Sequence, residues 1–343
     1  MLLATPRFWY RPRPGPLAWL LRPLGWLYGL AVGIHRARSR PWQPPLPVVS
    51  VGNLTLGGTG KTPLVIALAR ELAGRGWRPA LLSRGYGSGR RQPLRVGPQM
   101  AAALVGDEAL ELVSGLPGLA VWVGADRVAS ARRALEAGAD LLLLDDGLQH
   151  WPLSRDCDIT VLDGERRLGN GLLFPAGPLR ERPTALARAD LLVLSGALPA
   201  ARADPAGLSW PANRPWFPIA ARLELPSALR QRPLLAFCGI GLPEKFFAAL
   251  REEGCRLMGC EAFPDHHPYA RSDVERLLTL ARAQHNATLV TTGKDWQRLT
   301  PVLTPQERVA VVPLGLRLDP EAVARLADAV QAVLARRGWG RRG

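Results

Sequence analysis

Lysine is nearly absent from this chain of 343 residues. Of its 44 basic residues only Lys61, Lys245 and Lys294 are lysines, and all the others are arginines. A compact ammonium and a planar guanidinium are not interchangeable, so a Lys kept against this bias can mark a position that needs a point charge. Lys61 lies in a glycine-rich segment and Lys294 in a Thr-Thr-Gly-Lys-Asp run. We interpret Lys61 as functional, whereas chance explains Lys245 equally well.

Cysteine is also scarce. The four cysteines form no Cys-x-x-Cys pair, and no His lies at metal-ligand spacing from two of them; they are Cys157, Cys238, Cys255 and Cys260. This pattern excludes the common zinc motifs and is typical of reduced, mostly buried thiols in a cytosolic protein.

The chain carries a net charge of +15, and its basic residues are least balanced near the N-terminus. No acidic residue precedes Glu71. A basic arm can bind nucleic acid or anionic lipid. The residues between its arginines are apolar and aromatic rather than polar. We therefore exclude a nucleic-acid partner, since phosphate-tracking arms are not this apolar.

Residues 16–34 form an apolar stretch close to the length of a membrane span. Arg22 would cost about 2.5–3.5 kcal/mol at the centre of a bilayer, and Pro23 interrupts a helix. Tryptophans lie along the stretch and arginines follow it, which favours a helix lying in the headgroup region of a membrane surface. A true span and a soluble core helix remain alternatives, whereas a signal peptide fits poorly because no small-residue cleavage site follows.

Short apolar runs alternate with helical segments along the rest of the chain. Strands are expected near 46–51, 79–83, 120–123, 141–144, 159–162 and 191–194, and helices near 62–73, 107–115, 125–138 and 179–189. Fully apolar strands alternating with helices predict an α/β domain with a mostly parallel sheet.

A second, smaller α/β domain is expected after a linker at 196–216. Its strands are predicted at 234–240, 288–292 and 309–312, and its helices near 243–252 and 269–285. The predicted division is an N-terminal segment 1–45, a first domain 46–215 and a smaller domain 216–343. A last helix at about 320–336 belongs to the second domain or crosses back to the first.

A glycine-rich segment between a strand and a helix predicts a P-loop at residues 52–62. Its glycines let backbone N–H groups turn toward phosphate, and the helix N-terminus adds partial positive charge. Lys61 can reach the β- and γ-phosphates of a nucleotide, and the Thr62 hydroxyl can bind Mg²⁺. The predicted nucleotide contacts are Gly57, Gly58, Thr59, Gly60, Lys61 and Thr62. Thr55 stands where the strict motif has glycine, so the loop is a variant.

Two further segments carry candidate acids and bases. The apolar run 141–144 ends in Asp145 and Asp146, where a carboxylate beside a P-loop would bind Mg²⁺. Asp107 opens a predicted helix, where it is either an N-cap or a functional acid. His266, in Phe-Pro-Asp-His-His-Pro-Tyr, is either structural or a general base.

Taken together, these motifs resemble the tetraacyldisaccharide 4′-kinase family of lipid A biosynthesis over nearly the whole chain. The matching segments are VVSVGNLTLGGTGKTP (48–63), SRGYG (83–87), GDEA (106–109), DDGLQH (145–150), GNGLLFPAGPLRE (169–181), FPDHHPY (263–269) and the Lys-Asp of TTGKD (291–295). Gly293 departs from this pattern, because the family usually has Glu there.

The resemblance implies an ATP-dependent kinase with a P-loop NTPase-type fold. The reaction would transfer the γ-phosphate to the 4′-hydroxyl of a tetraacyl glucosamine disaccharide 1-phosphate and give lipid IVA. The enzyme would act at the cytoplasmic face of the bacterial inner membrane.

The resemblance also implies roles for single residues. Asp107 and His266 would take the hydroxyl proton, and Lys61 would hold the phosphates. Arg84 and Arg180 are candidates for binding a substrate or transition-state phosphate, and each could instead form a structural ion pair. The residues implied for Mg²⁺ are Thr62, Glu108, Asp145 and Gln149.

Because the acid and the base come from segments on either side of the linker, we expect the active site in a cleft between two domains. A membrane-associated P-loop ATPase acting as a partner switch is the main alternative. A lipid-binding scaffold with an inactive nucleotide site is a second alternative, against which the intact Lys61, Thr62 and Asp145 argue.

Overall fold

The computed structural model describes residues 6–196, 205 and 207–340. It divides into two compact units: a larger one of Pro6–Ala221 with Leu318–Gly343, and a smaller one that includes Arg222–Arg317. The chain therefore leaves the larger unit at Ala221 and returns to it at Leu318. Residues 197–204 and 206 of the linker expected at 196–216 lie outside the described residues.

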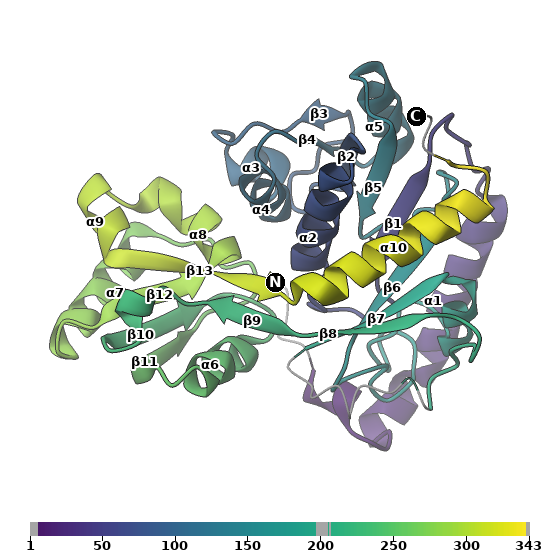
Figure 1. Cartoon of the computed structure of the whole chain (residues 1–343). Helices are drawn as coiled ribbons and strands as arrows, with labels where there is room; N and C mark the ends of the chain where they lie inside the picture. Colours follow the sequence, from purple (N-terminus) through teal and green to yellow (C-terminus); the bar gives the residue numbers. More distant parts are fainter. Residues whose placement is uncertain (1–5, 197–204, 206, 341–343) are drawn as a thin grey trace. The chain divides into compact units, whose positions relative to one another are not determined.

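An eight-stranded sheet forms the centre of the larger unit (Figure 1), and all its pairings are parallel except that between β3 and β4. Its order is β3 (Leu94–Arg95), β4 (Ala120–Val123), β2 (Pro79–Ser83), β5 (Leu141–Asp145), β1 (Val48–Gly52), β6 (Cys157–Asp163), β7 (Leu191–Ser195) and β8 (Trp216–Ile219). The predicted mostly parallel α/β architecture is confirmed.

Helices cover both faces of this sheet, which explains why its central strands are apolar throughout. Successive residues of a strand point to opposite faces, so Leu141 and Leu143 join one core cluster while Leu142 and Leu144 join another. On the first face lie α2 (Lys61–Gly74), α4 (Asp107–Gly115) and α10 (Pro320–Arg336), and on the second lies α5 (Arg127–Glu136). A short α3 (Ala102–Val105) precedes α4.

The last helix, α10, belongs to the larger unit. It lies beside α2 (Figure 1), and Arg75 at the end of α2 donates to the Ala324 carbonyl at 3.0 Å and to Gln331 at 2.7 Å. The sequence left open which domain this helix joins, and the buried apolar face of α10 settles the question.

The N-terminal segment forms a short 3-10 helix, η1 (Arg7–Tyr10), and the long helix α1 (Pro16–Arg38). Among the described residues α1 is the one helix long and apolar enough to cross a membrane. Contrary to expectation, α1 continues through Pro23. Pro23 is the eighth residue of α1, so the helix loses one backbone hydrogen bond there. Packing of small residues such as Ala18 and Gly25 against the protein holds the helix in place.

The smaller unit contains a five-stranded sheet in the order β11 (Arg256–Ala262), β10 (Pro233–Cys238), β12 (Thr288–Thr292), β13 (Val311–Leu318) and β9 (Ala221–Glu224). Its helices are α6 (Pro243–Glu252), α7 (Arg271–Ala283), α8 (Gly293–Leu299) and α9 (Pro305–Ala310). Two apolar clusters, one containing Phe237 and the other Phe247, lie on opposite sides of β10.

Some predicted elements are wrong. The helix expected at 179–189 is only a 3-10 helix, η2, at Pro183–Arg188, because Leu179 and Arg180 lie in extended backbone that bonds to residues 54–56. The strand expected at 309–312 begins only at Val311, because α9 occupies the preceding residues. Three of the four cysteines are buried and all four are free thiols.

Candidate active site

The glycine-rich loop joins the end of β1 to the start of α2. Gly57 and Gly60 have positive φ angles of 103° and 77°, which side chains with a Cβ rarely adopt. Lys61 and Thr62 are the first two residues of the helix, with Gly60 as the N-cap. Their backbone N–H groups therefore lie at the positive end of a helix, which is the usual geometry of an anion site.

Two polar side chains brace this loop from inside the protein. Asn53, which is fully buried, donates to the Thr59 hydroxyl at 3.2 Å, and Ser195 at the end of β7 donates to the Thr59 carbonyl at 2.6 Å. The loop is thus held in shape by the sheet itself.

The departure from the P-loop pattern at Thr55 has a structural reason. Thr55 is buried and forms an antiparallel bridge with Leu179, and the neighbouring backbone donates from Leu56 to Pro178 and from Arg180 to Leu54, each at 2.7 Å. Extended, paired backbone does not need glycine. This pairing places Arg180 beside the phosphate loop.

Asp145 and Asp146 meet the loop from the neighbouring strand. Asp145, the last residue of β5, is buried and paired in register with Val51 of β1. Asp146 turns into left-handed backbone at φ 54° and faces two cations, with 3.5 Å to Lys61 Nζ and 2.8 Å from the Arg180 guanidinium. Burial alone would raise the pKa of the Asp146 carboxyl, but Lys61, Arg180 and Arg127 outweigh burial and hold this pKa well below its usual value.

Arg127 is a site residue that the sequence analysis missed. It is the first residue of α5 and is 4% exposed, and its guanidinium donates to the backbone carbonyls of Asp146 at 2.9 Å and Asp145 at 3.2 Å. Burial lowers the pKa of Arg127 below its usual value, although the charges of Asp146 and Asp145 act to raise this pKa. Arg127 therefore clamps the turn that carries both carboxylates.

Glu181 was also missed, and it organises Gln149. The buried Glu181 carboxylate accepts from Arg188 at 2.6 Å and from the Gln149 amide at 3.1 Å. The same amide group donates to the Asn53 carbonyl, and the Gln149 side-chain oxygen accepts from Arg180 at 3.3 Å. Glu181 lies within the family-matching segment 169–181, but nothing in its local sequence indicated this contact with Gln149.

Asp107, Glu108 and Arg84 lie in the same larger unit. Asp107 is 6% exposed and is the first residue of α4, whose N-cap is Gly106, so Asp107 is not the N-cap. Gly106 packs so closely that a Cβ there would lie 2.8 Å from the Tyr86 carbonyl, just beyond β2. Glu108 follows on α4, and Arg84, exposed after β2, is near enough to Arg127 to lower its pKa.

The oxygen donors at this edge suit Mg²⁺. Thr62 and Asp145 are 5% and 3% exposed and lie at the ends of α2 and β5 that meet the loop, and hydroxyl and carboxylate oxygens are the ligands Mg²⁺ prefers. Gln149 uses both ends of its amide on protein groups, so it fits this role less well. Across the described part of the chain no three His, Cys, Asp or Glu residues gather as a metal cage, and Mg²⁺ at nucleotide sites usually keeps water and phosphate ligands instead.

His266 lies in the smaller unit, on the segment between β11 and α7. Its backbone is left-handed, with φ 56°. The partnership of Asp107 with His266, and the cleft between two domains that it requires, remain predictions. The larger unit alone brings together the phosphate loop, Lys61, the carboxylates Asp145 and Asp146, and Arg180.

A mostly parallel sheet with a glycine loop between strand and helix, a lysine on that loop and a carboxylate at the end of the adjacent strand defines a P-loop nucleotide-binding protein. A sequence model of the tetraacyldisaccharide-1-P 4′-kinase family matches residues 17–331. The chain belongs to this family.

Individual relatives agree. The chain is 42% identical to the tetraacyldisaccharide 4′-kinase of Parvibaculum lavamentivorans, covering 96% of this chain and 98% of the relative. It is 44% identical to that of Gluconacetobacter diazotrophicus, covering 94% and 97%. The crystal structure of LpxK from Aquifex aeolicus in complex with ATP is similar with a TM-score of 0.72 and 27% identity, over 92% of this chain and 99% of that one.

Proposed function

We propose that this protein transfers the γ-phosphate of ATP to the 4′-hydroxyl of a tetraacyl glucosamine disaccharide 1-phosphate and so produces lipid IVA. The acceptor in this proposal rests on membership of the tetraacyldisaccharide-1-P 4′-kinase family. The phosphotransfer rests on the ion pair of Lys61 with Asp146, backed by Arg180, at the mouth of the glycine loop. Phosphoryl transfer depends chiefly on placement and charge neutralisation, and this group supplies two cations against phosphate.

In the reaction, the 4′-oxygen forms a bond to the γ-phosphorus while the bond from that phosphorus to the β,γ-bridging oxygen breaks, leaving ADP. The hydroxyl proton passes to His266, with Asp107 as its partner. A positioned base of this kind typically contributes about 10²–10⁴-fold. Bound Mg²⁺, held by Thr62 and Asp145, would neutralise negative charge on the phosphates.

The acceptor is a lipid, and α1 is suited to approach it. Large apolar side chains of α1 face outward with exposed fractions from 43% to 75%: Leu17, Trp19, Leu20, Leu24, Trp26, Leu27, Leu30 and Ile34. Arg22 lies over the rings of Trp19 and Trp26 at 4.6 and 5.4 Å. A helix with these features binds the interfacial region of a membrane, and we place the protein at the cytoplasmic face of the bacterial inner membrane.

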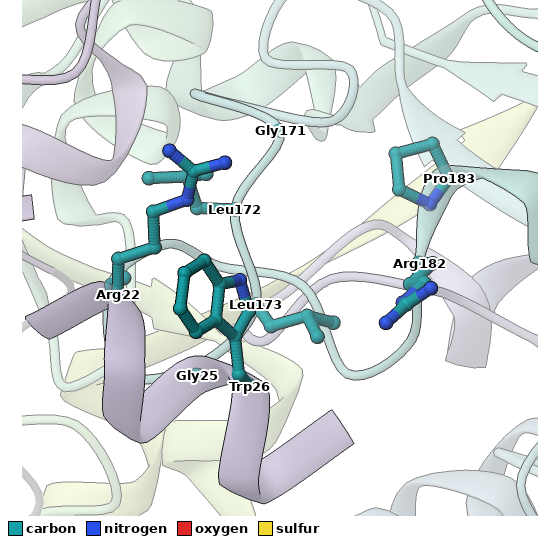
Figure 2. A pocket seen from close by; sticks show the side chains of 9 residues that line it. Arg22, Gly25, Trp26, Gly171, Leu172, Leu173, Arg182 and Pro183 are labelled. Atoms are coloured by element: carbon teal, nitrogen blue, oxygen red, sulfur yellow. The ribbon is translucent and has the colours of Figure 1, made fainter. Parts of the chain in front are cut away.

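A small pocket lies where α1 meets the segment 169–183. Figure 2 shows Arg22 and Trp26 of α1 facing the stretch that carries Leu172 and Leu173, with Arg182 nearby. The pocket is lined by Arg22, Gly25, Trp26, Gly171, Leu172, Leu173, Ala176, Arg182 and Pro183. Two guanidiniums among apolar side chains suit an anionic amphiphile. Since the cavity measures only about 150 Å³, we propose that it contacts a part of the lipid acceptor and does not enclose it.

The first test uses the purified protein in detergent with labelled ATP and the disaccharide 1-phosphate. A doubly phosphorylated lipid is the expected product. ATP hydrolysis without a lipid product would instead favour a membrane-associated ATPase that switches partners. Asp107→Ala and His266→Ala should each lower kcat by about 10²-fold or more while leaving ATP binding intact, and near-normal turnover in both would remove them from the chemistry.

The second test concerns the membrane. Leu20→Glu combined with Leu27→Glu should abolish sedimentation with vesicles containing anionic lipid, because both side chains are more than 60% exposed on α1. Val309→Glu is the matched control, since Val309 is an apolar residue of the smaller unit that is 84% exposed. Equal sedimentation of the double variant and the control would refute the role of α1.

A further inference from the structure

Asp295 is a fully buried carboxylate in the first turn of α8, with an exposed fraction of 0%. Its Oδ1 accepts from the Gly239 N–H and the Tyr269 hydroxyl, each at 2.9 Å, and from the Arg298 guanidinium at 3.1 Å. Its Oδ2 accepts from the Thr292 hydroxyl at 2.6 Å. A buried charge with this many donors is fully compensated and holds its donors rigidly.

Gly239 connects this carboxylate to His266. While its N–H donates to Asp295, its carbonyl accepts from the His266 N–H at 3.1 Å and from Arg298 at 3.1 Å. A Cβ at Gly239 would lie 2.9 Å from the Pro264 carbonyl and 3.2 Å from Asp295. The three segments are therefore packed too closely for any side chain at position 239.

The segment carrying His266 is fixed at both ends. Phe263 and Tyr269 are buried, and their rings lie edge-on to Phe237 of β10 at 6.3 and 5.9 Å. Tyr269 reaches past this apolar contact to Asp295 with its hydroxyl. Burial, and then the charge of Asp295, raise the pKa of that hydroxyl far above its usual value, so it remains a donor at every working pH.

His266 itself needs such support. Its φ of 56° places a residue with a Cβ in the left-handed region, where backbone persists only if its surroundings determine it. The hydrogen bond from its N–H to Gly239 supplies one such constraint and Tyr269 supplies another.

We propose that Asp295 is a positioning residue for His266: through Gly239 and Tyr269 it fixes the backbone that presents the imidazole to the acceptor hydroxyl. This proposal rests on the proposed function, in which His266 takes the proton. The proposal gives the Thr-Gly-Lys-Asp run a role that depends on Asp295. A Cβ at Gly293 would meet no atom within 4 Å, so this role does not depend on which residue stands at position 293.

The test combines turnover with a direct view of His266. The chain has five histidines, so labelling with ¹⁵N-histidine gives five backbone amide signals, and His266→Ala identifies the one of interest. Asp295→Asn should shift that signal and lower kcat by about 100-fold with the KM for ATP unchanged. Tyr269→Phe, which removes one donor and keeps the ring, should shift the same signal and lower kcat by about tenfold.

Glu275→Gln is the matched control. Glu275 is a carboxylate on α7 of the same unit, its side chain is 62% exposed, and it accepts from Arg271 at 3.1 Å rather than from residues 263–269. It should leave the His266 signal in place and kcat within about twofold of the wild type.

The outcomes separate the two proposals. Wild-type kcat in folded Asp295→Asn, when His266→Ala is inactive, overturns the positioning role. If Asp295→Asn does not fold, Tyr269→Phe decides, and wild-type kcat there overturns it equally. If His266→Ala is itself fully active, His266 is not the base, although the kinase activity stands. The His266 amide signal in Asp295→Asn then still shows whether Asp295 fixes the backbone at His266.

Discussion

Lys61 and Asp146 face each other at 3.5 Å across the phosphate loop, and Arg180 binds the second oxygen of the same carboxylate at 2.8 Å. One anion thus orients the two cations that would bind phosphate. Because Asp146 is about a third exposed and Lys61 mostly buried, the group is preorganised but open to a ligand. Preorganised charge is the main source of stabilisation in phosphoryl transfer.

Asp146→Asn should lower kcat by about 10²-fold, since Lys61 and Arg180 lose the charge that orients them. The free energy of unfolding should fall by only about 1 kcal/mol at neutral pH, because the pair is partly solvated. The pKa of this carboxyl is depressed in the folded state, so its contribution is present above the unfolded pKa of about 4 and is lost as pH falls below that value.

Melting temperatures between pH 3 and pH 7 check this sign. The wild type should melt at a higher temperature than Asp146→Asn at neutral pH, and this difference should shrink as the pH falls below about 4. A difference that stays constant over the whole range would contradict the ion pair as its cause.

Arg127→Lys should weaken the turn at Asp145 and Asp146, because a single ammonium cannot bridge two carbonyls as the guanidinium does. We expect a loss of about 1–3 kcal/mol in the free energy of unfolding and a fall of about tenfold in kcat. Urea denaturation and steady-state kinetics measure the two effects. Arg133→Lys on the same helix, where the side chain is 62% exposed, is the control and should change neither; equal behaviour of the two variants would count against the clamp.

Much of the larger unit's site was predictable, because its residues are close in sequence to strand ends. The order of strand, glycines, Lys61 and helix predicts the phosphate loop, and four leucines before Asp145 predict the carboxylate beside it. Parallel strands bring their carboxyl ends to one edge, so these two segments had to meet.

Arg127 and Glu181 could not be found in the same way. In a chain where arginine replaces nearly every lysine, one more arginine at the start of a helix carries no signal. The contacts of Glu181 depend on the extended pairing of 178–180 with 54–56, which local helix propensity misjudged. Strand β11 was missed because its residues are only half-buried and lack an apolar run.

Thr55→Gly restores the strict P-loop pattern but should impair the protein. Glycine increases the freedom of the unfolded chain and removes a buried side chain, so we expect a loss of about 1–2 kcal/mol in stability. The pairing that holds Arg180 should loosen, lowering kcat several-fold. Thr279→Gly, at an exposed position on α7, should cost only about 0.3 kcal/mol through helix propensity, because Thr is already a weak helix former, and should leave kcat unaltered. A gain in activity from Thr55→Gly would show that the bridge to Leu179 does not support the site.

His150 should make the free energy of unfolding depend on pH below about 6.5. Burial, and then the positive charges of Arg127 and Arg155, lower its pKa to about 3, whereas an unfolded chain has a histidine pKa of about 6.5. Between these two values the unfolded state binds a proton that the native state refuses, so stability rises with pH through this window and is constant above it. His150→Gln removes the titrating group and should flatten the dependence.

The measurement is the free energy of unfolding by urea at pH values from 4 to 8. The wild type should show an additional slope of at most about 1.4 kcal/mol per pH unit below pH 6.5, relative to His150→Gln. His35→Gln, at an exposed position on α1, is the control and should keep the wild-type slope. If His150→Gln keeps that slope as well, burial and the charges of Arg127 and Arg155 do not hold the imidazole neutral, and another group titrates in this window.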